Sequence, residues 1–296
     1  MTPSPSLGTA LHQLATYRTN NTRASQETFE QGCLILKSGS KTKHGDDVWA
    51  FLEQLALASI DVGRLDIADE CIRQLVDKFP KSPRVDALTG IRMEASASAD
   101  VVLQYYQELL DADPTNVAIW KRRISVLRRI GKIEMAVEEL LKFLDTFYTD
   151  TEGWLELADI YISCNQYTHA LEALSHALIL APQNPFTALQ FAETAYTAGD
   201  VPLALKMFLV VIDMSEHDIP TDDPPTGIRI RAWYGVKHCS RQLLATSSDA
   251  QSASGTAIAP PKQLRLIEEL ATERLLAAYK GQELGAQYVS TWLASH

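Results

Sequence analysis

A small apolar residue returns every 34 residues along the middle of this chain. Together these residues are Ala68, Val102, Ala136, Ala170 and Ala204. A second column stands 4 residues later, at Ile72, Tyr106, Leu140, Leu174 and Phe208. A third stands 7 residues after the first, at Leu75, Leu109, Phe143, Ala177 and Val211. These offsets place all three columns on one face of an α-helix, so the sequence predicts a helix that recurs with a fixed period.

Turn formers and helix stops recur in the same phase. The expected turns fall at Gly63, Ala97, Gly131, Asn165 and Gly199. Gly and Asn adopt the positive φ that a tight turn needs. Prolines follow three of the predicted second helices, at Pro80, Pro114 and Pro182, and proline cannot continue a helix. The pattern predicts an all-α tetratricopeptide (TPR) solenoid of about five in-phase helix–turn–helix repeats with helical caps at both ends.

The sequence indicates three parts. Residues 1–48 are expected to form N-terminal capping helices and a loop at 37–47. The TPR array spans 49–218, with units starting at residues 49, 83, 117, 151 and 185. Residues 219–296 are expected to hold C-terminal helices near 228–244, 263–279 and 284–293. A low-complexity insert rich in Ser, Ala and Pro, at 245–261, interrupts them and favours disorder.

One unit, 151–184, matches the TPR pattern almost completely. Its predicted structural core is Trp154, Leu157, Ala158, Tyr161, Ala170, Leu174, Ala177 and Pro182. Ala158 and Ala170 are small where the two helices would cross, which lets the backbones approach closely. In the N-terminal cap, Leu7, Leu11 and Leu14 share one expected apolar face, and Phe29, Cys33 and Leu36 share another.

Composition excludes several classes of function. The net charge is −10, which argues against general binding to nucleic acid or to anionic lipid. Four widely spaced cysteines suit a reducing compartment. The N-terminus lacks the features of a signal peptide, and no apolar run is long enough to span a bilayer. No catalytic motif, metal-ligand spacing or cofactor-binding loop is present, so we expect no enzyme activity, metal or cofactor.

A basic cluster stands out against this acidic background. It comprises Lys121, Arg122, Arg128, Arg129 and Lys132, with Arg123 between them. These residues fall on the first helix of the third unit, the helix that lines the inner, concave face of a TPR stack. One interpretation is a docking patch for an acidic peptide or subunit; the other is a solvated helix face. Glu134, Glu138 and Glu139 follow and could pair with the arginines, each pair contributing under about 1 kcal/mol.

Several segments resemble the ER membrane protein complex subunit 2 family. They are GDDVW at 45–49, GRLDIADECIRQLVDKFPKSPRVDALTGIRMEA at 63–95, DPTNVAIWKRRI at 113–124 and WLELADIYI at 154–162. The resemblance covers about residues 45–185. It implies a scaffold on the cytoplasmic face of the endoplasmic reticulum membrane. Such a scaffold would hold cytosolic segments of transmembrane subunits and one further cytosolic subunit of an insertase for tail-anchored and multipass membrane proteins.

Two alternatives remain open. One is a generic TPR adaptor of a soluble multiprotein complex. The other is a prenyltransferase-like α subunit, because DPTNVAIWKRR also resembles the repeat of that family. Those subunits would repeat the Trp–Arg motif, whereas this chain has Asp86 one repeat before Trp120 and Ala188 two repeats after it. A clamp for chaperone tails is disfavoured, since Glu53 and Leu57 stand where such a clamp would carry Lys and Asn.

Overall fold

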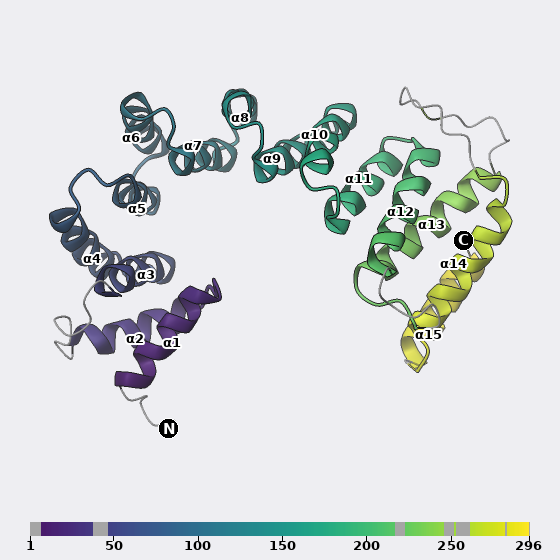
Figure 1. The fold of residues 1–296 in the computed structure, drawn as a ribbon, viewed down its shortest axis with the longest axis horizontal. Coiled ribbons are helices and arrows are strands. Elements are labelled where there is room, and N and C mark those ends of the chain that lie inside the picture. The colour runs from purple at the N-terminus through teal and green to yellow at the C-terminus, as the bar shows by residue number, and fades with distance from the viewer. Residues whose placement is uncertain are drawn as a thin grey trace. The chain divides into compact units, whose positions relative to one another are not determined.

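The computed structural model describes residues 7–37, 47–216, 223–245, 252, 261–281 and 283–295. In these ranges the chain forms fifteen α-helices and no β-strand (Figure 1). Most helices pack against the next one along the chain. The all-α class expected from the sequence is therefore confirmed.

Ten of these helices form five consecutive pairs with short connections. The pairs are α3 (Asp47–Val62) with α4 (Leu65–Lys78), α5 (Pro83–Glu94) with α6 (Ala99–Ala112), α7 (Val117–Arg129) with α8 (Ile133–Thr146), α9 (Thr151–Ser163) with α10 (Tyr167–Leu180), and α11 (Pro185–Thr197) with α12 (Val201–Glu216). The flanking helices are α1 (Leu7–Thr19), α2 (Ser25–Lys37), α13 (Ile228–Ala245), α14 (Leu264–Ala278) and α15 (Glu283–Ser295).

The chain divides into two compact units, residues 1–139 and 140–296, with the division inside α8. The scheme of two caps around one array is a different way to divide the chain, and it stays a prediction. The expected loop at 37–47 lies outside the described residues except at its two ends. Most of the predicted insert at 245–261 and of the segment between α12 and α13 also lies outside them.

The small-residue column closes the contact between the helices of each pair. Its members are fully buried: Ala68, Val102, Ala136, Ala170 and Ala204 each have 0% of their surface exposed. The column four residues later is buried as well, with Tyr106, Leu140 and Leu174 at 0%. In the third column Leu109 is only half-buried, and the neighbouring Leu110 is buried in its place. Small side chains here let the helices approach, and the larger ones fill the space beside them.

Tight turns follow the predicted glycine column with one exception. Gly63, Gly131 and Gly199 have φ values of 81°, 76° and 89°, and Asn165 has 59°. Ala97 is not among the residues with positive φ. The connection that contains it, residues 95–98, is longer than the connection between α3 and α4, so the chain reverses without a left-handed residue.

The buried face of α2 differs from the one expected. Its buried residues are Thr28, Gln31, Gly32 and Ile35, whereas Phe29, Cys33 and Leu36 are half-buried. The cause is a close approach to α3: a Cβ atom at Gly32 would lie 2.5 Å from Cδ1 of Leu55. The polar Thr28 and Gln31 share the face of this glycine and are buried with it.

Candidate functional site

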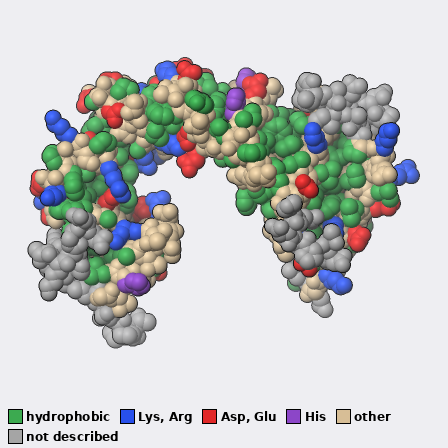
Figure 2. Space-filling model, viewed as in Figure 1, with side chains coloured by type: hydrophobic (Ala, Val, Ile, Leu, Met, Phe, Trp, Pro, Cys, Tyr) green, Lys and Arg blue, Asp and Glu red, His purple; other side chains and the backbone are tan. Residues whose placement is uncertain are grey.

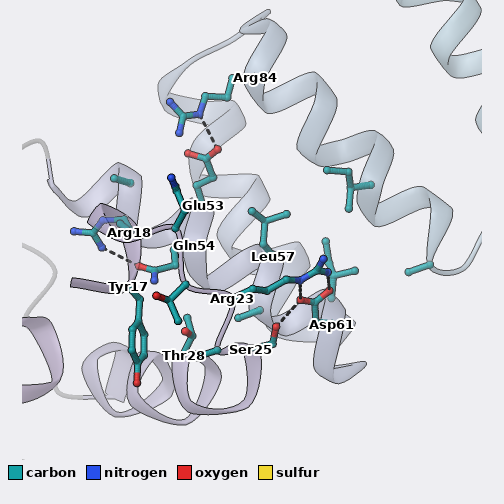
Figure 3. A pocket seen from close by; sticks show the side chains of 18 of the residues that line it. Tyr17, Arg18, Arg23, Ser25, Thr28, Glu53, Gln54, Leu57, Asp61 and Arg84 are labelled. Atoms are coloured by element: carbon teal, nitrogen blue, oxygen red, sulfur yellow. Dashed lines mark hydrogen bonds and ion pairs between the residues drawn. The ribbon is translucent and has the colours of Figure 1, made fainter. Parts of the chain in front are cut away.

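A cleft of about 680 Å³ opens in the N-terminal unit (Figure 3). Its walls are the end of α1, the start of α2, and the facing sides of the first helices α3, α5 and α7. On the hollowed side of this unit, Figure 2 shows Lys and Arg side chains gathered with a few Asp and Glu side chains between them. Three other cavities among the described residues are smaller, at about 250, 280 and 340 Å³.

Two ion pairs cross one side of the cleft. Arg23, in the turn between α1 and α2, donates Nη2–H to Asp61 of α3 at 2.7 Å and Nε–H to the same carboxylate at 3.0 Å. Ser25 donates its hydroxyl to Asp61 at 2.6 Å. The bond from Arg23 lowers the pKa of Asp61, against a smaller effect of burial. Arg84 of α5 donates Nε–H to Glu53 of α3 at 2.7 Å. Each pair therefore joins α3 to a different neighbouring element.

Glu94, the last residue of α5, is the centre of a third group of charges. Its side chain is 7% exposed and accepts bonds from Arg122 of α7 at 2.7 Å and from the hydroxyl of Tyr106 at 2.6 Å. Arg129 approaches the second carboxylate oxygen at 3.5 Å. Burial and the bond to Glu94 raise the pKa of Tyr106. Burial alone would lower the pKa of Arg122, but its bonds to Glu94 raise it overall.

The structure divides the predicted basic cluster. Arg122 and Arg129 line the cleft, whereas Lys121 and Arg128 are half-buried on α7 and are not among its lining residues. The placement of Lys132 on the same helix was wrong, because α7 ends at Arg129. Lys132 precedes α8 and lies 3.7 Å from Asp100 of α6. The pairing expected with Glu139 is made by Arg123, at 3.0 Å.

Sequence inspection missed the other arginines of the cleft: Arg18, Arg23 and Arg84. Arg18 donates to the amide oxygen of Gln54 at 2.9 Å. The first two belong to the N-terminal hairpin, outside the predicted repeats, so no periodic signal marks them. The packing of α2 against α3 and the bonds between α1 and α3 bring this hairpin beside the repeat helices. Glu53 and Leu57, considered above as clamp positions, both line the cleft.

The predicted TPR core of α9 and α10 is only partly buried. Leu157, Ala158, Ala170, Leu174 and Ala177 are all buried. Trp154 is half-buried, with its ring stacked on His176 at 4.2 Å and its Nε1–H donated to the carbonyl of Tyr148 at 2.9 Å. Tyr161 is also half-buried, and Pro182 is exposed in the connection after α10. Connections run over the surface, so Pro182 ends the unit without entering its core.

The described residues provide no arrangement for metal chemistry and no transmembrane helix. No group of three or more His, Cys, Asp or Glu side chains in this part of the chain could hold a metal ion. None of its helices combines the length and apolar character needed to cross a bilayer. What the cleft offers is paired charge around an apolar floor, which suits recognition of another molecule.

Helical pairs in a 34-residue phase define a TPR-like helical repeat protein, and the cleft lies on the first helices of its N-terminal unit. The TPR-like fold is shared with the C-terminal part of a TPR repeat-containing protein from Cytophaga hutchinsonii. The TM-score is 0.58 at 15% identity, over 94% of this chain and 98% of that one.

Sequence relatives define the family. The family described as "EMC2 TPR-like repeat domain" matches residues 69–206. ER membrane protein complex subunit 2-A of Xenopus laevis is 37% identical over 210 residues, which is 70% of each chain. TPR repeat protein oca3 of Schizosaccharomyces pombe is 31% identical over 210 residues, covering 69% of this chain and 71% of that protein. The chain belongs to the ER membrane protein complex subunit 2 family, as its sequence motifs indicated.

Proposed function

We propose that this chain is a non-enzymatic scaffold subunit of the ER membrane protein complex, bound peripherally on the cytoplasmic face of the endoplasmic reticulum membrane. The observation that carries the proposal is 37% identity over 210 residues to a protein named as subunit 2 of that complex. The charged cleft on the first helices supports it, because repeat proteins use such faces to hold other polypeptides.

In this role the chain holds cytosolic segments of transmembrane subunits together with one further cytosolic subunit. The assembly as a whole would insert tail-anchored and multipass proteins. The scaffold contributes positions and contacts, while the transmembrane subunits provide the path into the bilayer. Lys121, Arg122, Arg128, Arg129 and Lys132 remain our proposed docking patch, now split between the cleft, the rest of α7 and the start of α8.

Membrane fractionation tests the scaffold role. The protein should pellet with endoplasmic reticulum membranes and be released by alkaline carbonate, because no helix of its described part can anchor it in the bilayer. Depletion of the transmembrane subunits should also release it. A protein that stays in the soluble fraction of gently lysed cells would instead be a generic TPR adaptor.

A charge reversal tests the docking patch. Lys121→Glu combined with Arg128→Glu should reduce the amount of partner subunits that co-purify, because both changes place acidic groups on the docking helix. Both side chains are half-buried, so the melting temperature is measured alongside to show that the variant keeps its fold. Arg73→Glu on α4, away from this helix, is the matched control. If partner recovery stays normal, the patch is a solvated face.

A further inference from the structure

The arginines of the cleft are held in place but remain open to solvent. The side chains of Arg23 and Arg84 are 82% and 78% exposed, although each is paired with a carboxylate of α3. A guanidinium has five N–H donors. Arg23 uses two of them on Asp61, and Arg84 donates Nε–H to Glu53. Both side chains are therefore oriented by their partners and still able to bind a second carboxylate.

The cleft carries an excess of positive charge inside an acidic protein. Five arginines and three carboxylates line it, while the whole chain has a net charge of −10. Its floor is apolar: Leu57, 38% exposed, lies among the charged side chains in Figure 3. A ligand that matches these features presents carboxylates to the arginines and one apolar side chain to Leu57.

We propose that this cleft binds a short extended segment of a partner polypeptide that carries acidic side chains on both sides of an apolar one. Arg23 and Arg84 receive the carboxylates, and Leu57 receives the apolar group. The volume of about 680 Å³ lies in the range of sites for small ligands, so it admits a few residues. The exposed Leu57 among the arginines favours a peptide with an apolar side chain over a nucleic acid. This inference rests on the scaffold function, since the segment belongs to another subunit.

The competing explanation is that these ion pairs only join helices. The two explanations predict different effects on the affinity for an acidic ligand when the two members of a pair are substituted in turn. If the pairs are purely structural, loss of Arg84 and loss of Glu53 change the affinity in the same direction. If the cleft binds carboxylates, Arg84→Gln removes a binding group, whereas Glu53→Gln removes a negative charge that competes with the ligand. The same contrast applies to Arg23→Gln and Asp61→Asn.

The experiment uses the purified full-length chain and fluorescence anisotropy. The probe is a short, labelled, unstructured peptide of glutamate, glycine and one leucine; its control has glutamine in place of glutamate. We expect the acidic peptide to bind at least about tenfold more tightly at low salt, and added salt to remove the difference. Arg84→Gln and Arg23→Gln should each weaken binding about two- to fivefold, and Glu53→Gln and Asp61→Asn should strengthen it by a similar factor. Arg73→Gln should leave it unchanged.

Two results would overturn the proposal. One is equal affinity for the acidic and the neutral peptide. The other is a change of affinity in the same direction when either member of a pair is substituted. Circular dichroism of each variant shows whether the fold is retained. The outcome is independent of membrane fractionation. If the chain pellets with membranes but shows no preference for the acidic peptide, the proposed ligand of the cleft is refuted and the scaffold role is retained.

Discussion

Gly90→Ala is a stringent test of the packing beneath the cleft. Gly90 lies in α5, where the ring of Tyr106 from α6 crosses it. A Cβ atom at Gly90 would lie 2.2 Å from Cε1 of Tyr106, 2.7 Å from its hydroxyl oxygen and 2.8 Å from Cζ. Tyr106 is fully buried and donates its hydroxyl to Glu94 at 2.6 Å. The ring cannot accommodate a methyl group without moving away from that carboxylate.

The expected cost follows from three contributions. Overpacking a buried site costs about 1–3 kcal/mol. Loss of a hydrogen bond to a charged acceptor adds about 1.5–3 kcal/mol. Replacing a mid-helix glycine by alanine returns about 0.5–1 kcal/mol of backbone entropy. We therefore expect Gly90→Ala to lower the free energy of unfolding by about 1.5–5.5 kcal/mol.

Urea denaturation followed by circular dichroism measures the change. Gly8→Ala in α1 is the matched control, because a Cβ there meets nothing within 4 Å; its effect should stay within about 0.5 kcal/mol. Adding Tyr106→Leu to Gly90→Ala should cost less than the sum of the two single changes, since the smaller side chain relieves the overlap. If Gly90→Ala is as stable as the parent chain, the close approach of Tyr106 is refuted.

Three further predictions concern buried polar groups. Burial and a carboxylate bond raise the pKa of Tyr106; stability should therefore fall as the pH rises past about 10, where the unfolded tyrosine ionises, and Tyr106→Phe should flatten that fall in urea titrations. Burial raises the pKa of Cys239 to about 12, so brief iodoacetamide treatment analysed by mass spectrometry should label the exposed Cys164 first; equal rates would contradict this. Lys237 of α13, 4% exposed, pairs with Glu268 of α14. Glu268→Gln should cost about 3 kcal/mol in thermal melts, more than Lys237→Met combined with Glu268→Leu, because only the single change strands a buried charge.

The repeat helices could be predicted from the sequence because each one obeys a local rule. A small residue is required where the two helices of a pair cross. The buried column that begins at Ala68 and ends at Ala204 provides one every 34 residues. Positive φ is required at a tight turn, and Gly63 and its equivalents provide it. The exceptions have local causes too. Gly32 shifts the buried face of α2, and the longer connection at Ala97 removes the need for a left-handed residue.

The cleft could not be predicted because its contacts do not follow the repeat. Arg23 and Asp61 are 38 residues apart, Glu53 and Arg84 are 31 apart, and Glu94 and Arg122 are 28 apart. None of these separations equals the 34-residue period, so aligning the units does not bring the partners into one column. A cluster of basic residues on one helix drew attention to Arg122 and Arg129, but not to the arginines of α5 and the N-terminal hairpin that line the same cleft.

At three places an ion pair joins a first helix to the next first helix or to α13. Glu53 of α3 pairs with Arg84 of α5, and Glu94 of α5 pairs with Arg122 of α7. In the C-terminal unit, Glu193 of α11 pairs with Arg231 of α13 at 2.8 Å. The two more exposed pairs, Glu53–Arg84 and Glu193–Arg231, contribute only about 0–1 kcal/mol each, far less than burying the apolar columns. Stability alone therefore does not explain why charges occupy these positions. Apolar packing closes each hairpin, and the paired charges keep the first-helix face ordered and polar, as the docking that we propose requires.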